Sequence, residues 1–208
     1  MQIIRRSSLA PVPWKNGGGI THEMIRMPAT GDPFLWRVSI AQIDASGPFS
    51  NFTGYSRHMV LLRGSGLRLR FPAGPDRQLL ETGDMTEFDG AVATQCELLD
   101  GPCTDLNLMI SASVTCARAW VERLLERRPL RPSFQGTVLA FAISGIVSVD
   151  LERRESTRLQ AWDLAVISAD EHGSIRPVGF DAGGAGRDAA AAPLVFFATV
   201  DDNFTVSS

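Results

Sequence analysis

The 208-residue sequence has little of what metal sites and disulfide frameworks are built from. Its three cysteines, Cys96, Cys103 and Cys116, follow no regular spacing, and its three histidines include no HxH pair. An odd cysteine count without a CxxC pattern argues against disulfides and structural zinc, and fits a reducing compartment. We therefore expect no metal site and no cofactor.

Strong charge and long hydrophobic runs are missing as well. The net charge is −3 and the estimated pI about 5.6, so the overall charge attracts neither nucleic acid nor anionic lipid. The most apolar run, VLAFAISGIVSV, is interrupted by Ser and Gly and is too short to cross a bilayer. The first residues lack the apolar segment of a secretory signal. We expect a soluble cytoplasmic protein without nucleic-acid or membrane partners.

Short apolar or alternating runs, bounded by Gly, Pro and Asp, fill the chain instead. They are LWRVSIAQI, HMVLLRGSGLRLRF, DLNLMI, TVLAFAISGIVSVDL, WDLAVI and PLVFFATV. Short strands at such spacing are typical of a β-sandwich or β-barrel. The sequence therefore predicts a mainly all-β fold.

An internal repeat refines this prediction. Gly145 lies 79 residues after Gly66, and Asp163 lies 79 residues after Asp84, each pair in a similar strand–turn–strand context. The same offset places residues 114–122 on LWRVSIAQI, although VTCARAWVERLLERR also fits a helical stripe; we follow the repeat and expect strand. The Gly/Ala-rich run 181–193 is then an inserted, mobile loop. Two stacked cupin-like barrels result, a bicupin with domains 1–112 and 113–208.

The usual catalytic motifs are absent. His22-Glu23 lacks the second histidine of HExxH, and the glycine run of PWKNGGGITHE matches neither nucleotide-binding pattern. No GxSxG elbow is present, and no cysteine has a histidine nearby in the sequence. We therefore assign no catalytic residue from motifs.

Polar residues alternate with apolar ones along several expected strands. Such residues either face water or line a partly polar barrel interior. Arg57 precedes the apolar strand MVLL, and a buried arginine needs a carboxylate partner, either a protein group such as Asp105 or a ligand. The alternating pairs are Thr21 and Glu23, Arg37 and Ser39, and Asp105 and Asn107.

The ordered stretches PWKNGGGITHE, WRVSIA, GPFSNFTGYSRHMVLLRGSGLRL, FDG and DLNLM resemble the HutD/Ves family over roughly residues 11–110. The resemblance implies a bicupin without cupin metal ligands. It also implies a regulatory protein of histidine utilisation that binds a metabolite such as N-formylglutamate or urocanate. Matching motif positions imply these ligand-binding residues: Trp14, Lys15, Asn16, Thr21, Glu23, Arg37, Ser39, Arg57, Asp105 and Asn107. His22 and His58 are not among them.

The sequence thus favours metal-independent binding of a small anionic metabolite in the N-terminal barrel. Arg and Lys supply charge for carboxylates, and Asn16 and Ser39 can hydrogen-bond an amide or formyl group. One alternative is a metal-independent isomerase or hydrolase of a formylated or amide acid, with Glu23 or Asp105 as general base. Another is a protein-interaction module. Exposed edge strands would allow a homodimer.

Overall fold

A computed structural model describes residues 1–130, 136–152, 154–180 and 189–201 of the chain. These residues form two compact units. Residues 8–113 make the N-terminal unit, whereas residues 1–7 and 114–208 contribute to the C-terminal unit. In the described part of the chain the only helices are the short 3₁₀ turns η1 (Arg6–Ser8) and η2 (Ala189–Ala191), and neither could cross a membrane.

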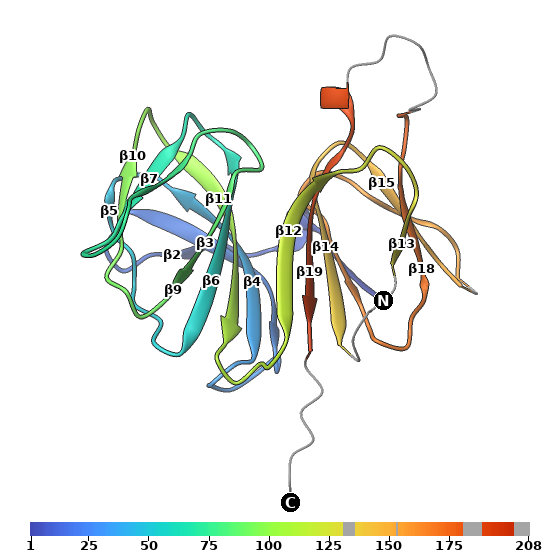
Figure 1. The fold of residues 1–208 in the computed structure, drawn as a ribbon, viewed down its shortest axis with the longest axis horizontal. Coiled ribbons are helices and arrows are strands. Elements are labelled where there is room, and N and C mark those ends of the chain that lie inside the picture. Colours follow the sequence, from blue (N-terminus) through green and yellow to red (C-terminus); the bar gives the residue numbers. More distant parts are fainter. Residues whose placement is uncertain (131–135, 153, 181–188, 202–208) are drawn as a thin grey trace, which may run out of the picture. The chain divides into compact units, whose positions relative to one another are not determined.

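The N-terminal unit consists of two sheets (Figure 1). The larger has six strands in the order β2-β3-β4-β11-β6-β9, and the smaller has four in the order β5-β10-β7-β8. All pairings are antiparallel. The strands are β2 (Val12–Pro13), β3 (Gly19–Met27), β4 (Trp36–Ile43), β5 (Gly47–Pro48), β6 (Tyr55–Arg63), β7 (Leu67–Arg70), β8 (Arg77–Leu79), β9 (Met85–Asp89), β10 (Gln95–Leu98) and β11 (Cys103–Ser111).

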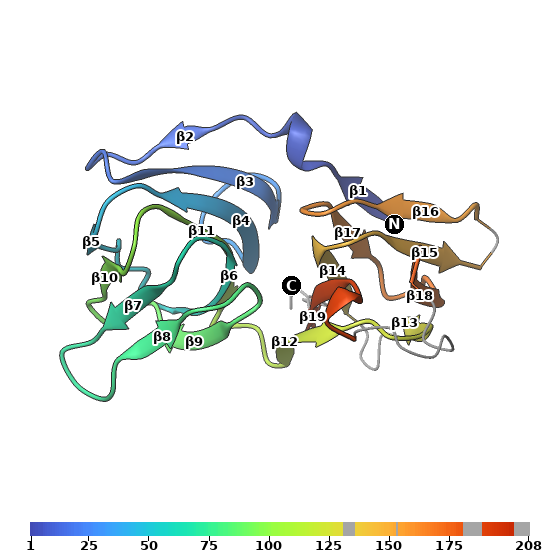
Figure 2. The ribbon, with the colours of Figure 1, turned by 90° about the horizontal axis from the view of Figure 1, so that it is seen from above.

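The core of this unit lies between its two sheets, which face each other in Figure 2. Alternate side chains of β4 and β6 in the large sheet, Ile43, Met59 and Leu61, meet Leu67 and Leu69 of β7 in the small sheet. Successive side chains of a strand point to opposite faces of the sheet. The alternation seen in LRLRF and WRVSIAQI therefore shows which residues share a face. We call the core side of the six-stranded sheet its inner face.

The C-terminal unit also has two sheets, in the orders β1-β17-β14-β19-β12 and β13-β18-β15-β16. Strand β1 comes from the start of the chain and pairs with β17, so that Ile3 lies opposite Ala165. The strands are β1 (Gln2–Ile4), β12 (Ala117–Arg123), β13 (Arg128–Leu130), β14 (Thr137–Ser144), β15 (Val147–Leu151), β16 (Thr157–Leu159), β17 (Leu164–Ile167), β18 (Gly173–Pro177) and β19 (Leu194–Val200).

The segment with two competing predictions is a strand. Residues 117–123 form β12, which pairs with β19 along its whole length. Trp120 stacks on Phe197 at a centroid distance of 5.4 Å. The strand expected from the repeat is confirmed, because the ladder with β19 outweighs the local helical periodicity. Of the expected loop 181–193, residues 181–188 lie outside the described residues, and Ala192 is buried.

Turns before the matching strands can be compared in the two units. Gly66 and Gly145, which precede β7 and β15, both have positive φ, 106° and 74°, but they are not equivalent. The carbonyl of Gly66 accepts a hydrogen bond from Leu99 N–H, and in the C-terminal unit the carbonyl of Ile146 accepts one from Val178 N–H.

Asp84 accepts hydrogen bonds from the backbone N–H groups of Leu80 and Glu81 through Oδ2. Asp163 accepts one from the N–H of Gln160 in the same way. The 79-residue offset therefore fits Asp84 and Asp163 but not the two glycines. The N–H groups of Leu61 and Ala142, which donate to the carbonyls of Asp84 and Asp163, are 81 residues apart.

Candidate functional site

Seven of the ten expected ligand-binding residues share the inner face of the N-terminal unit. The register of β3, β4, β11 and β6 places them on one side of four neighbouring strands. The face also carries the apolar residues Ile43, Met59 and Leu61, so polar groups continue a hydrophobic core. The seven residues are Thr21, Glu23, Arg37, Ser39, Arg57, Asp105 and Asn107.

The centre of this face is almost closed to solvent. Asp105, Asn107 and Ser39 are 3%, 5% and 2% exposed. On β11, Asn107 pairs with Ser39 of β4 and with Met59 of β6, so amide and hydroxyl are direct cross-strand neighbours. Buried polar groups are costly unless they find partners, which makes this cluster an unusual filling for a core.

Arg57 is the buried cation of the cluster. It is 8% exposed, and its Nε donates to Oδ1 of Asn107 at 3.4 Å. Three phenylalanine rings surround the guanidinium, with Cζ 5.2, 5.7 and 5.0 Å from the ring centroids of Phe49, Phe52 and Phe88. Cation–π contacts stabilise a desolvated arginine but supply no negative charge. The sequence left open whether Asp105 is the ion-pair partner of Arg57. In the structure, no side-chain nitrogen of Arg57 lies within 4.0 Å of a carboxylate oxygen of Asp105.

Arg37 is a second guanidinium on the same face. Its Nη1 lies 4.0 Å from Glu23 Oε2, and its Nη2 contacts Met109 Sδ at 3.4 Å. Its Nε is buried without a hydrogen-bond partner among the described residues. Arg37 also lies over Phe52, with Cζ 5.3 Å from the ring centroid. One ring therefore contacts both guanidinium groups and holds them near each other.

Burial sets the ionisation of these groups. It raises the pKa of the Asp105 carboxyl to about 7, although Arg57 opposes the shift. It lowers the pKa of Arg57 to about 10, with Asp105 raising and Arg37 lowering it further. Burial also lowers the pKa of Arg37, and Glu23 partly restores it. Near neutrality, Arg57 and Arg37 are therefore cations and the Asp105 carboxyl is only partly ionised.

The three other expected residues lie in the turn before β3. The indole Nε1 of Trp14 donates to Thr21 Oγ1 at 2.7 Å, which links this turn to the inner face. Lys15 and Asn16 are exposed. Oδ1 of Asn16 accepts a hydrogen bond from the backbone N–H of Gly18 at 3.0 Å, a local turn contact. The structure thus links Trp14 to Thr21 and leaves Lys15 and Asn16 exposed in the turn.

The histidines lie elsewhere. His22 and His58 alternate with the inner-face residues of β3 and β6, and so point to the opposite face. His58 Nδ1 lies 3.8 Å from Glu87 Oε2, and burial lowers the pKa of this imidazole while Glu87 raises it. Across the residues that the structure describes, no three His, Cys, Asp or Glu side chains are grouped so that they could hold a metal ion.

Sequence reasoning missed the aromatic surroundings of the two arginines. Phe49 and Phe52 stand out in the sequence only as core residues of a loop, and Phe88 lies in β9 as the first residue of the FDG stretch. Their approach to Arg57 depends on the register of β6 with β9, where Arg57 lies opposite Phe88. The FDG stretch, which covers the end of β9 and the residue after it, was the only local signal for Phe88.

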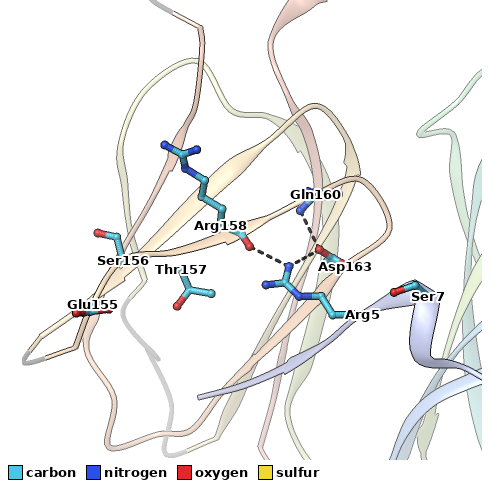
Figure 3. A pocket seen from close by; sticks show the side chains of 8 residues that line it. All are labelled: Arg5, Ser7, Glu155, Ser156, Thr157, Arg158, Gln160 and Asp163. Carbon is cyan, nitrogen blue, oxygen red and sulfur yellow. Dashed lines mark hydrogen bonds and ion pairs between the residues drawn. The ribbon is translucent and has the colours of Figure 1, made fainter.

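A polar pocket of about 440 Å³ lies in the C-terminal unit and was not foreseen (Figure 3). Arg5 reaches across it, and its Nη1 pairs with Asp163 Oδ2 and donates to the carbonyl of Arg158. The charge of Arg5 is therefore already used to hold the start of the chain on this unit. The lining residues are Arg5, Ser7, Glu155, Ser156, Thr157, Arg158, Gln160 and Asp163.

A search against protein families matches residues 6–181 to the HutD family. The chain belongs to the HutD family. It is 39% identical over 173 residues to an uncharacterized 21.2 kDa protein in the hutC 3′ region of Pseudomonas putida, covering 82% of this chain and 88% of that protein. It is 31% identical over 134 residues to protein Ves of Escherichia fergusonii, covering 64% and 68% of the two chains. The resemblance noted in the sequence is confirmed.

Solved structures agree with this assignment. A conserved protein of unknown function from Pseudomonas aeruginosa PAO1 matches with a TM-score of 0.82, 29% identity, and coverage of 96% and 98%. HutD from Pseudomonas fluorescens SBW25, described as a formate condition, matches with a TM-score of 0.75, 28% identity and the same coverage. Bacillus subtilis oxalate decarboxylase shares the fold at 9% identity and a TM-score of 0.64, covering 98% and 78%. The all-β fold is therefore cupin-like.

Proposed function

We propose that this HutD-family protein binds a small carboxylate on the inner face of its N-terminal unit, as a metal-independent bicupin that regulates histidine utilisation. Its family and its hutC-region relative support the link to histidine utilisation. The nature of the ligand is argued from the site. We place its action in the cytoplasm, in line with its free cysteines.

The observation that carries this proposal is the unbalanced charge of the inner face. Arg57 is buried, yet no carboxylate of the described residues lies within 4.0 Å of it, and Arg37 has only the distant Glu23. A buried cation without a counter-ion is unfavourable, and a ligand carboxylate would supply two charge-assisted hydrogen bonds. The fold keeps this arrangement where an apolar side chain would be more stable.

The neighbouring groups favour an acid that also carries an amide or a formyl oxygen. Asn107 has an amide N–H₂ group to donate, and the Ser39 hydroxyl makes no hydrogen bond to the described residues. N-formylglutamate offers carboxylates and a formyl group, and urocanate offers a carboxylate on a planar ring. Formate is the smallest acid of this class, and it appears in the description of the HutD structure.

Calorimetric titration with N-formylglutamate, urocanate, glutamate and formate tests the proposal. We expect saturable heat from at least one of these acids. Arg37→Met should weaken binding at least tenfold, because a hydrogen bond to a charged group contributes about 1.5–3 kcal/mol. Lys15→Ala tests whether the turn also contacts the ligand.

Arg118→Met is the matched control, since Arg118 occupies in β12 the ladder position that Arg37 has in β4, opposite Thr199 rather than Met109. Its dissociation constant should equal that of the wild type. The proposal is wrong if none of the four acids gives heat, or if Arg37→Met and Arg118→Met behave alike.

A second function is favoured by Asp105 itself. A buried carboxyl with a pKa of about 7 suits a general base near neutral pH, whereas the Glu23 side chain is 41% exposed. In this alternative Asp105 takes a proton from water, which attacks the formyl carbon of an N-formyl amino acid. Asp105 then gives this proton to the nitrogen as the C–N bond breaks, which releases formate and the free amine. Formate appearing in proton NMR spectra with the wild type and not with Asp105→Asn would establish it.

A further inference from the structure

Asp105 is a carboxyl without a partner in the middle of a sheet. It lies on β11 between Ala41 of β4 and Leu61 of β6, and is 3% exposed. Among the residues that the structure describes, none forms a hydrogen bond with it or lies within ion-pair distance. Burying an ionised carboxylate without partners is costly, and such a group lowers the cost by taking up a proton. In its acid form Asp105 is a hydrogen-bond donor.

Positive charge lies two positions along the same face. Arg57 and Asn107 both point to this face, and the Nε–Oδ1 contact between them leaves the Nη groups of Arg57 without a hydrogen bond to the described residues. Arg57 and Asp105 interact electrostatically, so an anion that reaches these Nη groups is exposed to the charge of Asp105 as well. Two negative charges in a desolvated space repel strongly, so both are accommodated only if one of them is protonated.

We propose that the inner face binds its carboxylate ligand together with one proton, which Asp105 holds and donates as a hydrogen bond to a ligand oxygen. This inference rests on the proposed function and adds the ligand's protonation chemistry to it. The proton comes from solvent, no covalent bond changes, and the protein–ligand complex gains one positive charge relative to binding of the anion alone. The site then selects a single carboxylate oxygen as the hydrogen-bond acceptor.

Of the charged and titratable groups around it on this face, Asp105 is the one that changes protonation near pH 7. Arg57 on β6 stays cationic, because its pKa of about 10 is well above neutrality. Cys96 on β10 and Cys103 on β11 stay neutral, since burial raises the pKa of Cys96 to about 12 and also raises that of Cys103. Arg37 and Glu23 lie farther along the face, on β4 and β3.

The pH dependence follows from these states. The pKa of Asp105 is about 7 without ligand, and a bound anion raises it further. Below pH 7 the acid form is already present, so affinity is nearly constant. Above pH 7 each unit of pH costs up to about tenfold in affinity, because a proton must first be taken up. We expect binding to be about tenfold weaker at pH 8 than at pH 6.

Calorimetry of the whole chain with N-formylglutamate, or with formate if the larger acid gives no heat, tests this. Titrations at pH 6, 7 and 8 should show the tenfold change. At pH 8, the heat in phosphate and in Tris should differ by nearly one proton multiplied by the difference in the ionisation enthalpies of the two buffers. Asp105→Asn keeps a neutral donor, so its affinity and heat should not depend on pH or buffer.

His58 provides the decisive control, since its imidazole is the nearby group with a reference pKa in the same range and lies on the opposite face of β6. His58→Gln should retain the full pH dependence. Loss of the dependence in His58→Gln overturns the inference, as does wild-type binding that ignores pH and buffer; in both cases the proposed function survives. If no probe binds, both fail. If Asp105→Asn does not fold, the two-buffer experiment on the wild type decides.

Discussion

The inner faces of the two units contrast sharply. In the N-terminal unit the face is polar around Arg57 and Asp105, whereas the corresponding face of the C-terminal unit is part of an apolar core cluster. The strand ladders allow a comparison position by position. At the matching ladder positions, Val195 corresponds to Asp105 and Phe197 corresponds to Asn107. In the same way, Val138 corresponds to Arg57 and Trp120 corresponds to Ser39.

This contrast teaches that similar sheets serve two purposes. Burying a Val or Phe side chain stabilises a fold by about 1.5–3 kcal/mol, so the C-terminal face contributes to stability. The polar face forgoes this contribution and carries desolvation costs as well. Such a departure from core composition is expected where a protein binds a ligand. Under the proposed function, stability and binding are thus separated between the two units.

The largest expected effect comes from exchanging the two faces at one position. Val195→Asp should lower the free energy of unfolding by about 5 kcal/mol, because it buries a carboxyl between Ala142 and Glu122, whose carboxylate already pairs with Arg128. Asp105→Val should change it by less than about 1 kcal/mol at pH 7 or increase it. Urea unfolding followed by circular dichroism measures both.

Val195→Thr controls for shape, since it is nearly isosteric and uncharged, and should cost less than half as much as Val195→Asp. Equal losses for Val195→Asp and Asp105→Val would contradict the assignment of stability to one face and binding to the other.

A smaller effect concerns stability against pH. The pKa of Asp105 is higher in the folded protein than the ordinary 3.8, so between pH 4 and 7 the folded state binds more protons than the unfolded state. The resulting stabilisation is complete below pH 4 and is lost as pH rises through 7. Asp105→Asn removes this pH dependence. Between pH 4 and pH 8, its free energy of unfolding should therefore rise by up to about 4 kcal/mol relative to that of the wild type.

Urea unfolding of both proteins at pH 4, 6 and 8 measures this difference, in which the other titrating groups cancel. Parallel stability profiles would show that Asp105 titrates at its ordinary pKa in the fold.

The smallest effect compares two buried serines. Ser148 in the C-terminal unit donates to Asp150 Oδ1 at 2.9 Å, whereas Ser39 makes no side-chain hydrogen bond in the described part of the chain. Ser148→Ala should lower stability by about 1 kcal/mol and leave ligand binding unchanged. Ser39→Ala should leave stability unchanged and weaken binding about fivefold. Unfolding and calorimetry on the same samples separate the outcomes, and an effect of Ser39→Ala on stability alone would argue for a structural role.

Much of the inner face could be predicted, because a strand's period of two is visible in the sequence. It pairs Arg37 with Ser39 and Asp105 with Asn107 on the same side of their strands. The period does not say which strands are neighbours. That β11 lies between β4 and β6 is decided by long-range pairing, and only this brings Asp105 near Arg57.

Other features had no readable signal. The contact between the Phe88 ring and the Arg57 guanidinium depends on the pairing of β6 with β9. Residues 117–123 carry a helical pattern and form a strand because β19 pairs with them. The position of Arg5 beside Asp163 joins residues 158 positions apart, which no local pattern reveals.

The pairing of β1 with β17 affects the order in which the two units can fold during synthesis. Residues 2–4 are synthesised about 160 residues before their partners, residues 164–166. The N-terminal unit needs only residues 8–113 and can close while synthesis continues, since domains generally fold as units. Strand β1 cannot pair until residues 164–166 have been synthesised. A separately produced fragment 114–208 would therefore lack one edge of its sheet, and adding residues 1–7 as a peptide should restore it.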